Sequence, residues 1–240
     1  VSWPPWARHC QIWKSQYPSA LLPAQNHLVW CAVAQNWAQA KMAMKLLNWA
    51  QTPKSAMRMW NNMEHEKLVL MSCCAPCSAG AIQQLVNGEI AGVDDFIVLF
   101  FNPNIFPESE YTKRLNEQIK YCEKLGVKYA VGNYDHAAWR AHIAGLEKEP
   151  ERGARCSRCF EFRFQYAAAF ARAHGYTAVA SVFGVSRHKD QSQVDAAGQG
   201  VLGACYVPIK WNEKLRQQIG RGSDFYRQNY CGCEFSIRKV

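Results

Sequence analysis

Apolar runs and helical periodicities alternate along the chain from Lys67 onward. Residues 94–101 form the continuous apolar run that is expected of a strand buried on both faces. Shorter apolar segments at 67–72, 127–132 and 177–184 predict three further strands. The sequence therefore predicts four strands, each separated from the next by a polar or helical stretch.

Helical segments fill the intervals between these strands. We predict helices over residues 77–86, 107–126, 137–145 and 156–174. Gly126 and Gly175 are expected to end the second and the fourth. The second helix is expected to bury an apolar stripe formed by Tyr111, Leu115, Ile119, Cys122 and Leu125. This alternation predicts an α/β domain with a mainly parallel, Rossmann-like (nucleotide-hydrolase-like) sheet flanked by helices, in which ligands bind beyond the carboxyl ends of the strands.

The composition changes near residue 62. Residues 1–62 hold seven of the nine Trp and no Asp or Glu, and they show no strand alternation. An apolar pattern from Leu28 to Trp49 is compatible with an amphipathic helix on a membrane or a partner. We favour another interpretation, because Met63 directly precedes the first strand. Residues 1–62 are then an N-terminal extension, poorly ordered or from an upstream start, and 63–240 form a single catalytic domain.

The net charge of the chain indicates what kind of partner it binds, and the expected compartment decides how its cysteines are interpreted. The net charge of +9 favours an acidic partner such as nucleic acid. Six of the 28 basic residues but only one of the 19 acidic residues lie in 1–65, so the α/β part is only mildly basic. Without a signal peptide or an apolar run of about 18 residues, we expect a cytoplasmic protein with no membrane partner. In that compartment, grouped thiols among the 11 cysteines indicate metal ligands or catalysts.

Two cysteine pairs have the spacing of metal ligands. Cys73 and Cys74 stand where the first strand gives way to a helix, and a turn there lets both approach one metal. Cys156 and Cys159 share one face of a helix. Four thiolates suit a [4Fe–4S] cluster or a structural zinc, although adjacent cysteines fit a zinc knuckle badly. Buried core thiols are the simpler alternative.

Three further cysteines are less clear from the sequence. Cys231 and Cys233, separated only by Gly232, are either a strained and therefore easily reduced disulfide or two free thiols in a flexible tail. Cys77 is a further ligand, a thiol on the substrate side or a packed helix residue. Cys122 falls in an apolar helix stripe, so we expect it in the core.

Five segments in fixed order resemble one known family. They are SCCAPCS, FFNPNIFPESEYTKR, NYDHAAW, RCSRCFEFRF and QNYCGCEFS, and they span about residues 67–236. Together they resemble the epoxyqueuosine reductase family of the QueH type. The resemblance implies an iron–sulfur oxidoreductase that converts epoxyqueuosine to queuosine at the wobble position of the tRNAs for Asp, Asn, His and Tyr. This is the last step of queuosine biosynthesis.

The resemblance also implies cofactors and site residues. The ligands of a [4Fe–4S] cluster would be Cys73, Cys74, Cys156 and Cys159. Cys231 and Cys233 would form a redox-active disulfide, and no cobalamin is expected. Some family members have Asp at the position of Cys77, an oxygen ligand suited to a second, mononuclear iron. The partners are tRNA carrying epoxyqueuosine and an electron donor that the sequence does not identify.

The remaining roles have several candidates. The proton donor is sought among Tyr134, Asp135, His188 and Asp190. The tRNA path is sought along Arg152, Arg155, Arg158 and residues 186–189, with Phe101, Tyr111 and Tyr226 as rings that stack on a base. Two competing hypotheses are a zinc-stabilised tRNA- or protein-binding module without catalysis and an ATP-using PP-loop thiolase. A PP-loop thiolase would need a Gly/Ser-rich phosphate cradle after the first strand, and the sequence has SCCAPCS there instead.

Overall fold

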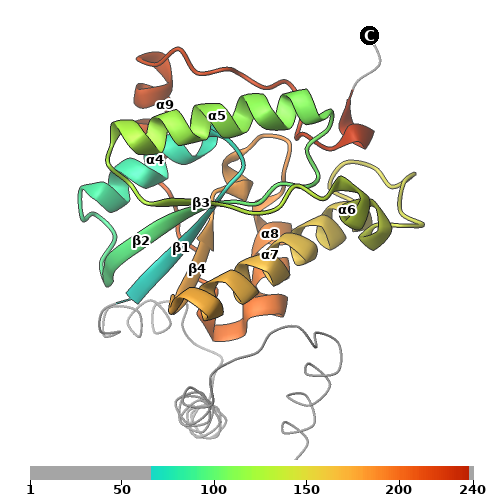
Figure 1. Cartoon of the computed structure of the whole chain (residues 1–240), viewed down its shortest axis with the longest axis horizontal. Coiled ribbons are helices and arrows are strands. Elements are labelled where there is room, and N and C mark those ends of the chain that lie inside the picture. Colours follow the sequence, from blue (N-terminus) through green and yellow to red (C-terminus); the bar gives the residue numbers. More distant parts are fainter. Residues whose placement is uncertain (1–65, 238–240) are drawn as a thin grey trace, which may run out of the picture. The chain divides into compact units, whose positions relative to one another are not determined.

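Four parallel strands form where the apolar runs predict them. The computed structural model describes residues 66–237 (Figure 1). The strands are β1 (Glu66–Ser72), β2 (Val93–Phe100), β3 (Tyr129–Val131) and β4 (Ala178–Ser181). The predicted N-terminal extension, 1–62, lies outside the described residues, as does the start of the predicted catalytic domain at Met63. The prediction of a parallel α/β sheet is confirmed.

The strand order creates a switch point beside β1. The sheet runs β3-β2-β1-β4, and every pair is parallel. Met71 of β1 aligns with Leu99 of β2 on one side and with Ser181 of β4 on the other. The chain moves outward from β1 to β3 and then crosses back to β4. Ligand sites of open parallel sheets lie at the carboxyl ends of the strands beside such a reversal.

Two layers of helices cover the sheet. The helices of these layers are α4 (Ala75–Val86), α5 (Glu108–Lys124), α6 (His136–His142), α7 (Ala154–His174), α8 (Gln191–Leu202) and α9 (Glu213–Arg221). Three short 3₁₀ turns are η2 (Phe183–Val185), η3 (Gly203–Cys205) and η4 (Glu234–Ser236). Helix α4 packs against α5 and α9 on one face, and α7 packs against α6 and α8 on the other (Figure 1). The elements after residue 185 were not predicted from the sequence.

The helix ends follow local sequence signals. Gly175 adopts the left-handed conformation at the end of α7 (φ 70°), and Gly126 does so just beyond α5 (φ 65°), as predicted. Asp135 caps α6 by accepting a hydrogen bond from the Ala138 amide at 2.8 Å. Asp190 caps α8 in the same way through the Gln193 amide at 2.9 Å. These caps set the positions of the loops that surround the site.

The buried faces differ from the predicted ones at two elements. Only the last three residues of β2, 98–100, are fully buried, and its first five are partly buried or exposed. On α5 the predicted apolar stripe is wrong in part, since Leu115 and Ile119 are only half-buried. A polar stripe is buried on α5 instead, and its members are Glu110, Arg114 and Gln118. Cys122 is fully buried, which confirms its predicted core position. No helix within residues 66–237 is long and apolar enough to cross a membrane.

Candidate metal and redox site

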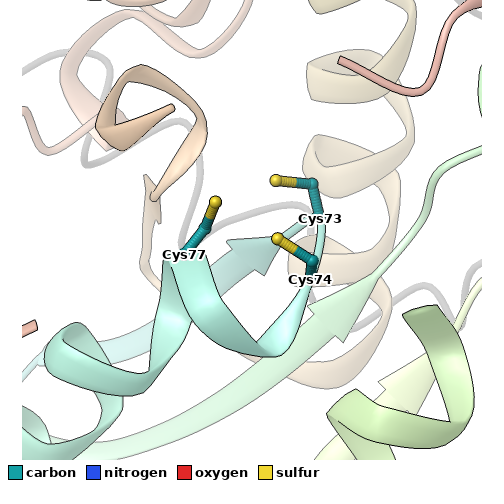
Figure 2. A group of neighbouring side chains, drawn as sticks. All are labelled: Cys73, Cys74 and Cys77. Carbon is teal, nitrogen blue, oxygen red and sulfur yellow. The ribbon is translucent and has the colours of Figure 1, made fainter. Parts of the chain in front are cut away.

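Three thiols converge at the carboxyl end of β1. The Sγ atoms of Cys73, Cys74 and Cys77 all lie within 4.8 Å of one another. Figure 2 shows that Cys73 and Cys74 come from the turn and Cys77 from the first turn of α4. Cys74 is the N-terminal cap residue of α4 and has an extended backbone (φ −177°). The tight turn therefore lets two adjacent side chains and a third residue face one point.

Hydrogen bonding among the three thiols favours the thiolate form at Cys73. Hydrogen bonds from Cys74 and Cys77 hold the pKa of Cys73 well below its usual value, and the charges of Lys189 and Arg163 act in the same direction. The pKa of Cys77 is raised to about 12, mainly because its thiol donates to Cys73. The pKa of Cys74 is raised as well, for the same reason. A thiolate with two thiol neighbours is a soft ligand set of the kind that iron–sulfur clusters and zinc use.

The predicted cysteines of α7 are not part of the three-thiol group. Within residues 66–237, Cys156 and Cys159 do not belong to the group whose sulfurs lie within 4.8 Å of one another. Cys156 nevertheless packs against the same core cluster as Cys73 and Cys74. Its Sγ accepts a hydrogen bond from the Arg152 amide at 3.3 Å, and burial raises its pKa to about 11. Cys159, by contrast, packs in a separate cluster with Cys231 and Cys233.

Cys231 and Cys233 are buried within the C-terminal segment of the chain. Both residues are free thiols, with exposed fractions of 9% and 7%, so they do not lie in an exposed tail. Gly232 between them has a positive φ of 107°, and the amide of Cys233 donates to the Sγ of Cys231 at 3.4 Å. A hydrogen bond from the Cys233 thiol lowers the pKa of Cys231 to about 5, and Lys189 adds to the effect. Within the pair, the thiolate form is therefore favoured at Cys231.

A narrow cavity joins the α7 thiols to the C-terminal pair. Its lining includes Cys156, Cys159, Cys231 and Cys233, together with Lys189 and Arg163. The ammonium group of Lys189 also lies 3.7 Å from the Sγ of Cys73, on the other cysteine group. Lys189 follows β4 and Cys73 follows β1, so they meet at the switch point of the sheet. The wider hollow between α5 and residues 222–225 contains no thiol.

Arg163 of α7 supports the floor of the site. Its side chain is fully buried, and its Nε donates to the Phe101 carbonyl at 3.2 Å. Its Nη2 donates to the side-chain oxygen of Asn102. The amide of Asn102 donates in turn to the Ser72 carbonyl at 2.9 Å. This chain of bonds connects α7 with the ends of β2 and β1, next to the turn that carries Cys73.

The four predicted proton donors have different surroundings. Asp135 and Asp190 cap helices, and Tyr134 donates to the Ile105 carbonyl at 2.9 Å. Only His188 lines the cavity with the thiols. Burial lowers its pKa, so its imidazole is neutral at pH 7. Lys189, the next residue, was predicted only as part of the tRNA path along residues 186–189.

The predicted tRNA contacts are accessible only in part. Arg155 is buried, and it donates to the carbonyls of Leu146 and Glu147. Arg152 and Arg158 are exposed. The rings of Phe101 and Tyr111 are buried, so stacking of a base on either ring is excluded. Tyr226 is partly buried and donates to Glu110 at 3.0 Å.

Comparisons with known proteins point to one family. The sequence model of the family "Epoxyqueuosine reductase QueH" matches residues 68–239. The chain is 37% identical to epoxyqueuosine reductase QueH of Haemophilus influenzae over 182 residues, covering 72% of this chain and 73% of that protein. It is 38% identical to the protein of that name from Histophilus somni, with the same coverage. Among solved structures, the U34-tRNA thiolase NcsA from Methanococcus maripaludis with its [4Fe-4S] cluster gives a TM-score of 0.36 at 16% identity. That alignment covers 50% of this chain and 39% of the thiolase, and a likeness this slight carries no argument.

Proposed function

This chain belongs to the epoxyqueuosine reductase QueH family, and on that premise we propose that it reduces epoxyqueuosine to queuosine at the wobble position of the tRNAs for Asp, Asn, His and Tyr. Family membership makes the chain an oxidoreductase. One observation supports the proposal above the others. Two sets of thiols from distant parts of the sequence meet at one sheet edge, with Lys189 beside both.

We infer that the metal centre is a [4Fe–4S] cluster with Cys73, Cys74, Cys156 and Cys159 as ligands. The donor set fits this group, because it consists of soft sulfur atoms and lies beside two cations, Lys189 and Arg163, that offset negative charge. When bound, the cluster would supply one-electron transfer. Because four cysteines would occupy its four irons, a Lewis-acidic iron for the epoxide oxygen would have to be the second, mononuclear one. Cys77 lies within 4.8 Å of Cys73 and Cys74, so it is a candidate ligand both for the cluster and for a second, mononuclear iron.

The electrons for one turnover come from the Cys231 and Cys233 dithiol. Both carbon–oxygen bonds of the epoxide break, a carbon–carbon double bond forms, and the oxygen leaves as water. This reduction needs two electrons and two protons. The two sulfurs give up two electrons as they form a disulfide. Cys233 provides one proton, because Cys231 is already a thiolate, and solvent provides the second. A further turnover requires an external reductant, for which dithiothreitol serves in vitro.

Lys189 and Arg163 keep the sulfurs in their reactive charge state. Both side chains line the cavity, and the positive charge of Lys189 favours the thiolate form of Cys73 and of Cys231. Arg163 is fixed by the bonds that tie α7 to the strand ends. Arg152 precedes α7 and donates to the Arg187 carbonyl, and Arg158 of α7 pairs with Glu161 at 3.0 Å. Both side chains are exposed, and we infer that they contact tRNA phosphates.

The proposal is tested by genetic complementation and by anaerobic purification. The gene should restore queuosine in the tRNA of a strain that accumulates epoxyqueuosine. The purified protein should be brown and should lose its colour with dithionite. Cys231→Ser should keep the colour and stop turnover. Failure to restore queuosine would contradict the activity, and a colourless protein with one zinc would contradict the cluster and favour the non-catalytic module.

A further inference from the structure

Three buried polar side chains form a stripe along α5. Glu110, Arg114 and Gln118 follow one another at four-residue intervals, so they lie on one face of the helix. Their exposed fractions are 8%, 2% and 1%. Nε of Arg114 lies 2.7 Å from Oε1 of Glu110, which makes the two an ion pair. The proposed reaction assigns no role to any of the three.

The first half of this polar stripe holds the backbone of the CxC segment, residues 230–233. Arg114 donates to the carbonyl oxygens of Cys231 and Tyr230 at 3.4 and 3.5 Å. Its guanidinium carbon lies 5.1 Å from the centre of the Tyr230 ring. The hydroxyl of Tyr226 donates to Oε2 of Glu110 at 3.0 Å. The ion pair therefore binds the C-terminal segment directly before the two redox cysteines.

The second half of the polar stripe holds the turn after β1. Oε1 of Gln118 accepts hydrogen bonds from the hydroxyls of Ser72 and Ser78, at 2.6 and 2.8 Å. Ser72 directly precedes Cys73, and Ser78 directly follows Cys77. A single amide oxygen thus connects both ends of the segment that carries the three converging thiols.

Stability alone gives no reason to bury this polar stripe. The desolvation of a buried ion pair offsets much of its Coulomb attraction, and apolar residues of similar volume often give an equally stable protein. A helix, however, keeps residues four apart at a fixed separation, about 6 Å along its axis. One rigid helix can therefore hold two separate cysteine groups at a constant distance from each other.

We propose that Glu110, Arg114 and Gln118 are positioning residues that fix the CxC segment and the turn after β1 relative to each other. The inference rests on the proposed function, in which electrons leave the CxC pair for a substrate held at the metal centre. Arg114 sets the backbone geometry of the CxC segment, and with it the ease with which the two thiols close into a disulfide. Gln118 sets the geometry of the three-thiol turn.

The first test measures the dithiol–disulfide equilibrium of the CxC pair. The double variant Glu110→Gln/Arg114→Met removes both charges, so no lone charge stays buried. In metal-free protein equilibrated with glutathione buffers and analysed by mass spectrometry, its equilibrium constant should differ from wild type by tenfold or more, about 30 mV for a two-electron couple. Lys120→Met changes an exposed residue of the same helix and should leave the constant unchanged.

Two single variants separate the halves of the polar stripe. Arg114→Lys keeps the charge beside Glu110 but lacks the planar guanidinium that reaches two carbonyls. It should therefore shift the dithiol–disulfide equilibrium constant of the CxC pair in the same direction as the double variant does. Gln118→Met removes the acceptor of the two serine hydroxyls. It should speed the alkylation of Cys73 and Cys74 several-fold in metal-free protein and leave the CxC equilibrium unchanged.

The outcomes distinguish this inference from the proposed function. If Cys231 and Cys233 of the wild type form no mutual disulfide under any buffer, the proposed redox role fails, whatever the variants do. If they form one and its equilibrium constant is the same in the folded double variant, the positioning role alone is wrong. Should the double variant fail to fold, Arg114→Lys gives the decision, because an unchanged constant there overturns the role of Arg114.

Discussion

The ammonium nitrogen of Lys189 lies 3.7 Å from the Sγ of Cys73, although 116 positions separate the two residues in the sequence. Cys73 follows β1 and Lys189 follows β4, which are neighbouring parallel strands. The charge of Lys189 also acts on Cys231 and Cys77. The charge of this one lysine therefore acts on both thiols whose pKa is lowered, Cys73 and Cys231.

Replacement of Lys189 should reduce the reactivity of Cys231. The positive charge favours the thiolate, so Lys189→Met raises the pKa of Cys231, and less thiolate is present near pH 5, where the wild-type thiol is about half ionised. In metal-free protein at about pH 5 we expect iodoacetamide to modify Cys231 several-fold more slowly, as followed by mass spectrometry. Lys189→Arg keeps the charge and should retain most of the rate, as should Lys214→Met on the exposed face of α9. Equal rates in wild type and Lys189→Met would show that the charge has no influence.

The pH dependence of Cys231 alkylation should differ from that of an ordinary thiol. Because the pKa of Cys231 is about 5, its thiolate predominates above that pH, and the alkylation rate falls as the pH drops through about 5. Cys233→Ala removes the hydrogen bond that contributes most to the low pKa. The fall in rate should then begin at a higher pH. A wild-type profile with its midpoint near the ordinary value of 9.0 would contradict the hydrogen bond between the two sulfurs.

Single serine variants should identify the cluster ligands. The proposed ligands are Cys73, Cys74, Cys156 and Cys159, and replacement of any one should remove most of the bound iron and sulfide. Cys205 lies far from these groups in the sequence and has no predicted role, so Cys205→Ser should keep the full content. Iron and sulfide analysis after anaerobic reconstitution measures the outcome.

Cys77→Ser provides the discriminating measurement within that series. If Cys77 serves a second iron, this variant keeps the cluster and loses at most one iron per chain. Loss of the whole cluster in Cys77→Ser, with retention in Cys156→Ser, would instead assign Cys77 to the cluster. The close approach of the Cys77 sulfur to Cys73 and Cys74 makes the comparison necessary.

Gly232→Ala should destabilise the protein by about 1–3 kcal/mol, because φ of 107° is strained for any residue with a Cβ. A Cβ there would also lie 3.0 Å from Cγ1 of Ile105 and 3.1 Å from Nη1 of Arg114. Gly200→Ala is the matched control, since its Cβ meets nothing within 4 Å in α8. That change should stabilise the protein by roughly 0.5–1 kcal/mol. Urea unfolding of the metal-free variants measures both, and equal free energies of unfolding would contradict the strain.

Part of the candidate site follows from local sequence. The turn that carries Cys73 and Cys74 could be predicted, because an apolar run followed by a helix start depends on near neighbours. The sequence left the role of Cys77 undecided, although a residue in the first turn of a helix necessarily lies beside the cap residue, here Cys74. Asp135 and Asp190 were predicted as candidate proton donors and not as helix caps, and the helix that follows Asp190 was not predicted.

The buried polar face of α5 shows where local reasoning ends. Glu110, Arg114 and Gln118 recur at helical spacing in the sequence, as plainly as the apolar Leu115 and Ile119. Hydrophobicity favours burial of the apolar residues, yet the C-terminal segment and the turn after β1 offer partners to the polar ones. The choice of buried face therefore depends on segments that lie far away in the chain.

The sequence by itself determined the four strands, the helices from α4 to α7 and the cysteines that are candidate ligands, because these depend on short-range periodicity and on residue chemistry. Only the tertiary structure decided that Lys189 meets Cys73, that Arg163 connects α7 to the strand ends, and which face of α5 is buried. The physical reason is that each of these contacts gains its free energy from burial and hydrogen bonding between distant segments. No window of neighbouring residues contains both partners of such a contact.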